Sequence, residues 1–311
     1  MNRSSPGLSI AKSIDGFLKF KTAEGLSQRT IASYEYMLNH WLKYIGDRSV
    51  SEIQASDLTG YMAWLRTEYK PVRFNGSKEP LSAKSIRNVW VTFRSFFGWL
   101  HVEFKYTNPA IEITAPKFQT HPVETFTKED VEKILKACVF SRESQTEERK
   151  KFVMRRPSAN RDQAIVLMLL DTGLRATELC SLTINDVDLK TGKVTIRHGV
   201  IGGAKGGKGR TVYLGKVARK AVWRYLVGRD DGDDPRAPLF ISQADRPFNK
   251  DSLRVLINRL GSRAEVKKTY PHKFRHTFAI TYLRSGGDVF TLQSLLGHGS
   301  LDMVRHYAQI A

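Results

Sequence analysis

The sequence predicts a mainly α-helical protein with one small antiparallel β-sheet, divided into two domains. Apolar residues recur at the spacing of amphipathic helices through most of the 311 residues. Two short stretches rich in β-branched residues, 193–198 and 209–214, are spaced for a β-hairpin with a long turn. A stretch with three prolines and little periodicity, residues 108–122, separates a helical first part from this mixed second part.

Residues 1–115 are predicted to form the first domain, built from four amphipathic helices. Ser27 and Ser82 stand where a side chain can cap the second and fourth helices, and Ser51 or Ser56 could cap the third. The aromatic residues of these helices follow the helical spacing, so we expect them in the core of the domain.

Residues 116–124 are interpreted as an extended linker and residues 125–311 as the second domain. Thr127 and Asp130 form a predicted capping box at the start of its first helix. Residues 141–160 are densely charged, which is typical of a flexible surface loop, with contact to DNA as the alternative. A later apolar run predicts a helix that ends at a glycine turn, followed by the hairpin and further helices.

The charge of the chain indicates a polyanionic partner. There are 50 Lys and Arg against 31 Asp and Glu, which gives a net charge of +19. Nucleic acid is therefore the first candidate partner and an anionic membrane surface the second. No run of about 18 apolar residues and no signal-peptide pattern is present. Cys138 and Cys180 lie far apart and match no zinc spacing, so we expect free thiols in a soluble cytoplasmic protein.

Basic residues on the polar helix faces of the first domain are candidate contacts to the DNA backbone. Such faces are normally only solvated, but the net charge makes contact with phosphate a real alternative. These candidates are Arg29, Lys84, Arg87 and Arg94.

A glycine-rich stretch at 202–208 imitates a nucleotide-binding loop. It fits G-x4-G-K, yet that motif needs Ser or Thr next, and Gly209 follows instead. The surrounding pattern is also strand–turn–strand. We expect the glycines to let a hairpin turn bearing Lys205 and Lys208 approach a phosphate backbone closely.

One stretch near the end of the sequence has the residues for phosphate chemistry. His272 and Arg275 form an H-x-x-R pair, His298 closes an LGH tripeptide, and Tyr307 follows nine positions later. Arginine can bind two phosphate oxygens, histidine can donate a hydrogen bond or move a proton, and a tyrosine hydroxyl can act as a covalent nucleophile. No carboxylate or cysteine belongs to this set.

These residues, in this order, resemble the tyrosine recombinase family, the phage integrase and Xer-like proteins. Each box alone is weak, but five in order over about 135 residues are specific. The boxes are TGLR-x-x-E-L with Arg175 and Glu178, a K-G-x-K-x-R turn with Lys205, Lys208 and Arg210, His272-x-x-Arg275, Leu296-Gly297-His298, and Tyr307.

The resemblance implies a helical, SAM-like core-binding domain followed by a catalytic domain. It also implies a site-specific DNA recombinase of the integrase, transposase or resolvase type. Such an enzyme cleaves and rejoins strands through a 3′-phosphotyrosyl intermediate and a Holliday junction, with no cofactor, metal or ATP. Its partners would be double-stranded DNA with specific sites and further copies of itself, from dimer to tetramer, at the nucleoid.

The resemblance also implies a role for each residue. Tyr307 is the expected nucleophile, Arg175, Arg275 and His298 the expected phosphate ligands, and Lys205 the expected general acid with Lys208 as the alternative. His272 is expected to be a general base or a phosphate-positioning group. Glu178 is expected to orient Arg175 or cap its helix, or to be a plain helix charge, and Arg210 is a candidate DNA contact. His276 and His306 adjoin the motif without occupying family positions and are expected to be structural or positioning residues. Tyr213, Tyr270 and Tyr282 are alternative phenols that we expect to serve packing.

Two features depart from the family pattern, and two other functions stay open. The charged insertion is longer than expected, and the sequence ends four residues after Tyr307, where members commonly continue into a helix that docks on a neighbouring protomer. The alternatives are a non-cutting DNA-binding regulator and a type IB topoisomerase or telomere resolvase. The target sequence and the biological reaction are not readable from the sequence.

Overall fold

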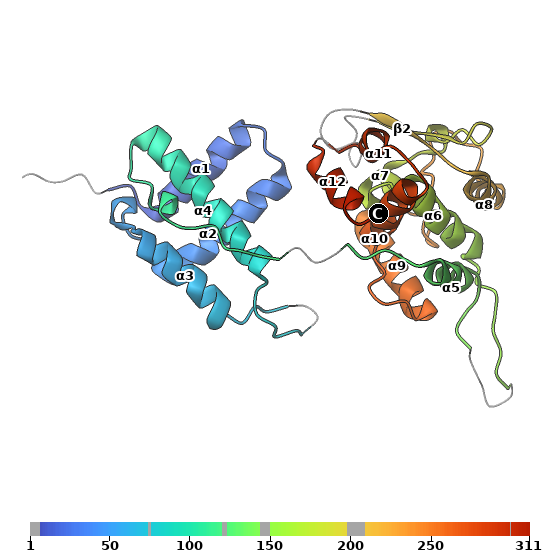
Figure 1. The fold of residues 1–311 in the computed structure, drawn as a ribbon, viewed down its shortest axis with the longest axis horizontal. Coiled ribbons are helices and arrows are strands. Elements are labelled where there is room, and N and C mark those ends of the chain that lie inside the picture. The colour runs from blue at the N-terminus through green and yellow to red at the C-terminus, as the bar shows by residue number, and fades with distance from the viewer. Residues whose placement is uncertain (1–6, 74–75, 120–122, 144–149, 198–208, 299) are drawn as a thin grey trace, which may run out of the picture. The chain divides into compact units, whose positions relative to one another are not determined.

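The computed structural model describes residues 7–73, 76–119, 123–143, 150–197, 209–298 and 300–311. The chain divides into two compact units, Met1–His121 and Pro122–Ala311, and each is described by itself (Figure 1). The described part of the chain is mainly helical with one two-stranded antiparallel sheet, which confirms the predicted fold class.

The described residues of the N-terminal unit form four α-helices, as predicted. Ser27 accepts a hydrogen bond from the Thr30 amide (3.2 Å) and begins the second helix, and Ser82 begins the fourth in the same way. The predicted start of the third helix is wrong: it begins at Ala55, where the Asp57 carboxylate accepts from the Gln54 amide at 2.9 Å. The elements are α1 (Ile10–Ala23), α2 (Gln28–Ile45), η1 (Val50–Glu52), α3 (Ala55–Thr67), α4 (Ala83–Phe104) and η2 (Pro109–Ile111).

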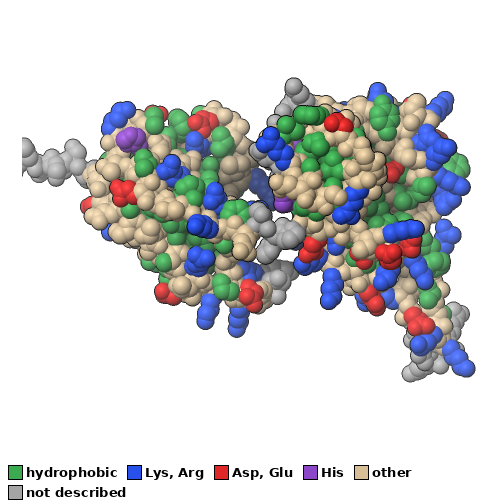
Figure 2. All heavy atoms as spheres, viewed as in Figure 1, with side chains coloured by type: hydrophobic (Ala, Val, Ile, Leu, Met, Phe, Trp, Pro, Cys, Tyr) green, Lys and Arg blue, Asp and Glu red, His purple; other side chains and the backbone are tan. Residues whose placement is uncertain are grey.

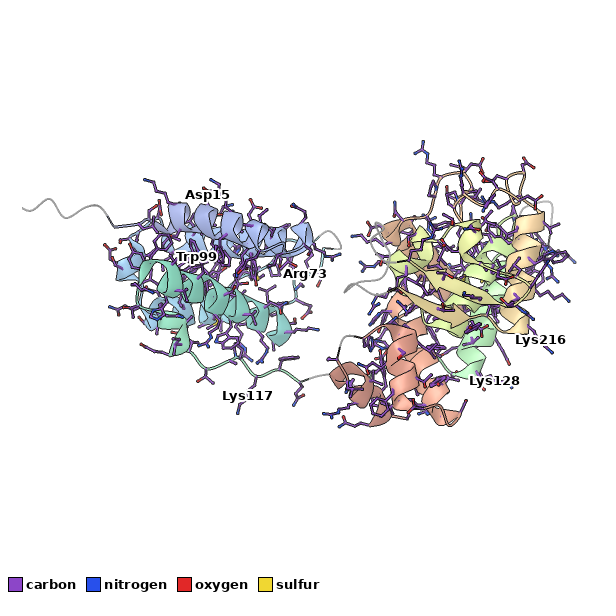
Figure 3. All side chains as sticks on the ribbon, turned by 90° about the horizontal axis from the view of Figure 1, so that it is seen from above. Asp15, Arg73, Trp99, Lys117, Lys128 and Lys216 are labelled. Carbon is purple, nitrogen blue, oxygen red and sulfur yellow. The ribbon has the colours of Figure 1, made fainter. Side chains whose placement is uncertain are left out.

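Aromatic rings fill the core of this unit, as the helical spacing predicts. Phe17 on α1 meets Phe96 and Trp99 on α4 with ring centroids 5.5 and 5.6 Å apart. Figure 3 shows Trp99 between these helices, and a Cβ at Gly16 would lie 3.2 Å from its ring. The small residue on α1 therefore lets the two helices approach closely.

The chain after α4 folds back along that helix. The Trp90 indole donates to the Ile113 carbonyl at 3.0 Å, and Arg87 donates to the Pro116 carbonyl at 3.2 Å. The Arg87 guanidinium also lies over the ring of Phe118, and Arg94 lies over Trp90. These contacts fix the chain up to residue 118, so part of the predicted linker packs on the first unit.

The C-terminal unit surrounds a buried helix. The apolar run 164–170 lies in α6, whose residues Ala164, Ile165 and Leu169 are fully buried against α5, α8 and α10. A helix that is apolar all round needs such cover on every side. The helices are α5 (Lys128–Val139), α6 (Ala159–Thr172), α7 (Ala176–Ser181), η3 (Ile184–Asp186), α8 (Lys216–Val227), α9 (Lys250–Ala264), α10 (Pro271–Arg284), α11 (Val289–Leu296) and α12 (Asp302–Ala308).

The predicted capping box and hairpin are both present in this unit. Thr127 and Asp130 exchange side-chain to backbone hydrogen bonds at 3.1 and 3.2 Å. Strands β1 (Lys193–Ile196) and β2 (Arg210–Tyr213) pair antiparallel with Lys193 opposite Tyr213. The described ends of the charged insertion also pair, since the Ser141 amide donates to the Met154 carbonyl at 2.8 Å.

The surface of both units is rich in positive charge. Lysine and arginine side chains are spread over the face of each unit seen in Figure 2, with fewer acidic side chains between them. Within the described ranges, no helix has both the length and the apolar character needed to span a membrane.

Candidate active site

A glycine turn places Arg175 at the start of a short helix. Gly173 ends α6 with a φ of +59°, the left-handed region that favours glycine. A Cβ there would also lie 2.5 Å from the Phe278 ring. The chain reverses at this residue and α7 begins one residue after Arg175, so the guanidinium points back toward the end of α11.

Glu178 holds Arg175 and Arg210 together inside the unit. Its carboxylate is fully buried and accepts from the Arg175 amide and guanidinium, both at 2.8 Å. It also accepts two hydrogen bonds from Arg210, at 2.9 and 2.7 Å. Burial would raise the pKa of Glu178, but the hydrogen bonds and charges of Arg210 and Arg175 lower it to about 2. Glu178 thus both caps α7 and orients Arg175.

Arg210 has its donors turned inward, and its DNA contact stays a prediction. Its side chain is only 8% exposed. Besides the pair with Glu178, its Nε donates to the Leu295 carbonyl at 2.6 Å. Arg210 therefore ties β2 to α7 and to the end of α11, and we assign it a positioning role.

Arg275 lies opposite Arg175 and contacts the same short segment. It is 1% exposed and donates to the carbonyls of Gly173 (2.8 Å) and Leu296 (2.7 Å). Arg175 donates to the next carbonyl, that of Gly297, at 3.0 Å. Two arginines from α7 and α10 therefore converge on the Leu296–Gly297 backbone, which begins the LGH box.

His298 joins this cluster through its ring nitrogens. Nε2 lies 2.8 Å from Nη2 of Arg275, and since arginine can only donate, Nε2 accepts and Nδ1 carries the proton. Burial, then Arg275 and Arg175, lower the pKa of His298 to about 4, so the ring is neutral at pH 7. Burial and Arg175 lower the pKa of Arg275 to about 9, which leaves that group charged.

Two buried donors in this cluster have no partner among the described residues: Nε of Arg275 and Nδ1 of His298. Buried N–H groups are almost always paired in folded proteins. The cluster also holds three guanidinium groups and one carboxylate, a net charge of +2 (3 − 1) over Arg175, Arg210, Arg275 and Glu178. Unused donors and excess positive charge in one place fit an anionic ligand.

Tyr307 lies beside this cluster, fully buried on α12. Its ring is nearly parallel to that of His298, with centroids 6.4 Å apart. Its hydroxyl lies 2.8 Å from Nδ1 of His276. Burial raises the pKa of Tyr307, and the charges of Arg275 and Arg175 oppose that shift.

His272 is exposed at the first turn of α10. Its ring meets the His276 ring at 4.4 Å in an edge-on arrangement. Desolvation, then Arg275 and Arg175, lower the pKa of His272. The remaining members of the predicted site, Lys205 and Lys208, lie outside the described residues.

The candidate DNA contacts of the first unit separate into two pairs. Arg29 and Lys84 are exposed near the starts of α2 and α4. Arg87 and Arg94 instead contact the chain that folds back along α4, Arg94 through the Ala110 carbonyl at 3.4 Å. Arg29 and Lys84 therefore remain the freer candidates for phosphate.

His276 was predicted to be only a structural or positioning residue, and the structure places its ring against Tyr307. It lies four residues after His272, so helical geometry alone puts both imidazoles on one face of α10. The spacing of the two histidines is therefore visible in the sequence. The contact of His276 with Tyr307 is not, because it depends on how α12 packs against α10.

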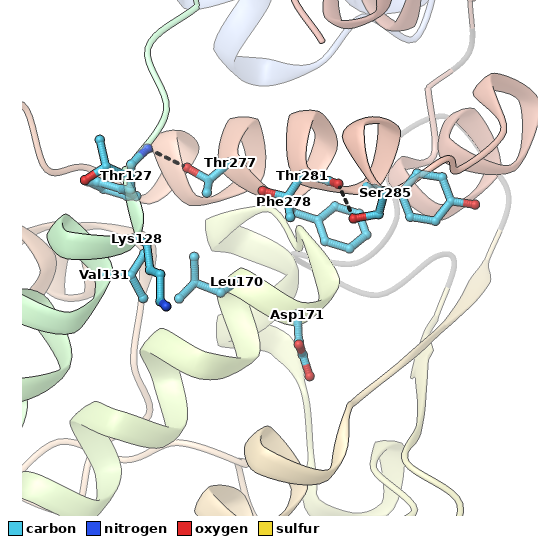
Figure 4. Close-up of a pocket in the computed structure, with 11 residues that line it drawn as sticks. Thr127, Lys128, Val131, Leu170, Asp171, Thr277, Phe278, Thr281 and Ser285 are labelled. Atoms are coloured by element: carbon cyan, nitrogen blue, oxygen red, sulfur yellow. Dashed lines mark hydrogen bonds between the residues drawn. The ribbon is translucent and has the colours of Figure 1, made fainter.

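A groove elsewhere in this unit contains none of the clustered residues. It has a volume of about 510 Å³ and lies between the start of α5, the end of α6 and α10, lined by Lys128, Leu170 and Thr281 among others (Figure 4). Among the residues the structure describes, no group of His, Cys, Asp and Glu is placed to hold a metal ion.

Comparison with known proteins shows the family to which this chain belongs. Residues 124–311 match the model described as "Phage integrase family", and residues 14–103 match "Phage integrase, N-terminal SAM-like domain". Tyrosine recombinase XerD of Listeria monocytogenes serotype 4b is 30% identical over 310 residues, 96% of this chain and 93% of the relative. The chain belongs to the phage integrase family. It is a site-specific tyrosine recombinase, an enzyme class that cleaves and rejoins DNA.

Solved structures share the fold over almost the whole chain. The Tn1549 transposon integrase, in complex with a circular intermediate DNA, has a TM-score of 0.73 at 18% identity, covering 97% of this chain and 95% of that one. A lambda integrase dimer bound to a core site has a TM-score of 0.71 at 16% identity, covering 97% and 77%. The likeness extends through both units.

Proposed function

We propose that the cluster around Arg275 binds the scissile phosphodiester of duplex DNA and that Tyr307 attacks its phosphorus. The observation that carries this proposal is the pair of buried donors without a partner among the described residues, Nε of Arg275 and Nδ1 of His298, in a cluster whose His298 ring stacks on the Tyr307 ring. Non-bridging phosphate oxygens would satisfy both donors. The product of the attack is a 3′-phosphotyrosyl bond and a free 5′-hydroxyl.

The net charge of the cluster suits the transition state better than the ground state. A phosphodiester carries one negative charge, and attack by a phenolate gives an arrangement with two. Arg175 and Arg275 would meet that growing charge, and His298 would donate a further hydrogen bond. Because Glu178 and the carbonyls of residues 173, 296 and 297 hold the guanidinium groups in place, little reorganisation is needed during the reaction.

The leaving 5′-oxygen needs a proton. Lys205 is proposed as the acid, with Lys208 as the alternative, because both belong to the K-G-x-K-x-R motif. Desolvation near the cationic cluster would lower a lysine pKa toward the range in which it can donate. Attack of a 5′-hydroxyl on the phosphotyrosine reverses the step, so the energy of the bond is kept without ATP or metal.

Double-stranded DNA is the proposed substrate and further copies of the chain the proposed partners. The net charge of +19, and Arg29 and Lys84 on the first unit, favour contact with a DNA backbone. One structural neighbour was solved with a circular intermediate DNA and another as a dimer on a core site. We infer a dimer to tetramer on paired sites, with exchange through a Holliday junction, on nucleoid DNA in the cytoplasm. Residues 1–115 would be the core-binding domain, 116–124 the linker and 125–311 the catalytic domain.

The test is a trapping experiment with a nicked substrate. The Tyr307→Phe protein first selects binding duplexes from a randomised library. The enriched duplexes are then nicked at successive positions, so that the short fragment beyond the cleaved bond is lost and cannot rejoin. Wild-type protein, Tyr307→Phe and the control Tyr213→Phe, which alters an exposed phenol on β2, are incubated with them in EDTA without ATP.

A covalent protein–DNA band from wild type and Tyr213→Phe, and its absence with Tyr307→Phe, is the expected result on a denaturing gel. An adduct that persists in Tyr307→Phe would overturn the assigned nucleophile. Binding without any adduct would favour a non-cutting regulator. Joining between two duplexes, scored with a second labelled DNA, separates a recombinase from a relaxing topoisomerase.

A further inference from the structure

We propose that His276 is the general base that removes the proton from the Tyr307 hydroxyl during DNA cleavage. This inference rests on the proposed role of Tyr307 as the nucleophile. It assigns to His276 the task that the family resemblance offered to His272.

Three histidines lie around Tyr307, and the structure places one of them on its hydroxyl. Nδ1 of His276 is 2.8 Å from the phenolic oxygen, inside the range for direct proton transfer. His298 stacks on the phenol ring, and its Nε2 is taken by Arg275. Among the described contacts, His272 meets the His276 ring and makes no hydrogen bond to Tyr307. His276 alone of the three is in place to accept this proton.

The surroundings of His276 keep it neutral and able to accept. His272 and Arg275 face it on its own helix, and His306 and Tyr307 face it from α12. Burial, followed by the charges of His272, Arg275 and His306, lowers the pKa of His276 to about 4. Near pH 7 the imidazole is therefore neutral, and in the tautomer with its proton on Nε2 the Nδ1 lone pair accepts from the phenol. A bound phosphodiester adds a negative charge beside the ring and raises its proton affinity at the moment of reaction.

Tyr307 needs such a base. Its side chain is fully buried and its pKa is raised by that burial, so a spontaneous phenolate is rare at neutral pH. In the proposed step the phenolic proton passes to Nδ1 of His276 as the bond from the phenolic oxygen to phosphorus forms. The bond from phosphorus to the 5′-oxygen breaks, and that oxygen leaves with the electron pair and takes a proton from the general acid. Rejoining runs the same transfers in reverse.

Two variants of His276 separate a base from a residue that only holds the tyrosine. His276→Gln retains a hydrogen-bonding side chain but cannot take up a proton near neutral pH. His276→Ala leaves a space that free imidazole can enter. His101→Gln is the matched control, because His101 lies exposed on α4 and its Nδ1 contacts only the Tyr106 carbonyl. All are measured by single-turnover cleavage of the selected nicked duplex, with duplex retention and circular dichroism as checks on binding and folding.

A second substrate isolates the step on the nucleophile. It carries sulfur in place of the bridging 5′-oxygen at the cleaved position. A thiolate leaves without being protonated, so this substrate no longer needs the general acid. A variant that fails to activate Tyr307 therefore still cleaves the sulfur substrate slowly. A variant that fails only to protonate the leaving group cleaves it at the wild-type rate.

We expect His276→Gln to bind the duplex normally and to cleave both substrates about 100-fold more slowly, the lower end for loss of a general base. Imidazole should raise the rate of His276→Ala and leave His276→Gln unchanged, and His101→Gln should match wild type. A wild-type rate for His276→Gln would overturn the proposal, and so would recovery of His276→Gln on the sulfur substrate. Adducts from Tyr307→Phe would instead overturn the nucleophile itself, which keeps the two failures apart.

Discussion

The two units of this protein bury different kinds of side chain in their interiors. The N-terminal unit buries rings, with Trp41, Phe93, Phe96 and Phe97 in mutual contact at centroid distances of 5.1 to 6.4 Å. The C-terminal unit buries charge as well, including Glu178 and Arg275 in its site. The apolar part of a ring is stabilised when it leaves water, whereas a buried charge needs partners that compensate for its lost hydration. The difference marks which unit carries the chemistry.

Two buried carboxylates of the C-terminal unit each form ion pairs with two arginines, which fixes the positions of those arginines. Asp162 pairs with Arg156 and Arg161, both at 2.8 Å, away from the site. Glu178 pairs with two arginines inside it. Buried ion pairs of this kind add little net stability compared with apolar residues, but removing one partner is costly. The two carboxylates therefore offer a matched pair for asking whether buried charge serves folding or catalysis.

The largest expected effect is that of Glu178→Gln. The substitution leaves Arg175 and Arg210 facing each other without a buried counter-charge. We expect the free energy of unfolding of the C-terminal unit to fall by about 3–5 kcal/mol. Cleavage of the nicked duplex should also fall strongly at a temperature where the variant is folded, because Arg175 loses its orientation. Hydrogen exchange of peptides from each unit measures the first effect, and the adduct assay measures the second.

Asp162→Asn is the control for that variant. It makes the same chemical change at a fully buried carboxylate that also serves two arginines. We expect a comparable loss of stability with single-turnover cleavage retained in the folded protein. Equal loss of cleavage in both variants would mean that the site merely follows the stability of the unit, and that Glu178 has no separate role in orienting Arg175.

Phe96→Ala should act on the N-terminal unit alone. Phe96 is fully buried and touches rings from three helices, so the cavity left behind should cost about 3–5 kcal/mol. Four of the five tryptophans belong to this unit, at 41, 64, 90 and 99. Tryptophan fluorescence should therefore report a weakened transition in denaturant, while hydrogen exchange in α6 and α10 stays unchanged. A matching loss of protection in those helices would show that the two units unfold as one.

The parts of this structure that the sequence predicted are those set by neighbours along the chain. Ser27, Ser82 and the Thr127–Asp130 box act on amides three residues away, and the glycine turn before Arg175 is equally local. The misplaced start of α3 was also local, but a Gln54 start has no strong capping residue to reveal it.

The parts that could not be predicted join distant residues. Arg210 meets Glu178 across 32 positions, and His276 meets Tyr307 across 31. The motif resemblance includes Glu178 as a partner of Arg175 and Arg210 as a candidate DNA contact, but it does not pair the two, because the pairing follows from how β2 packs against α7. A DNA contact was a natural interpretation of an arginine on a hairpin. Its burial in the ion pair became visible only with the folded chain.

The smallest expected effect is a difference in acid sensitivity between the two units. The pKa of Glu178 is about 2 in the folded protein, against an ordinary glutamate value of 4.5. A lowered pKa means that the stabilisation is complete above about pH 4.5 and is lost as pH falls toward 2, to a total on the order of 3 kcal/mol. Hydrogen exchange in α7 and α10 should therefore rise over that interval in wild type. In Glu178→Gln, hydrogen exchange in these helices should already be fast near neutral pH and should change less as pH falls, because the titrating group is gone. The N-terminal unit, whose core is built from rings, should give the same acid profile in both proteins. A wild-type acid profile that survived the substitution would locate the sensitivity in another carboxylate, with Asp162→Asn as the next variant to compare.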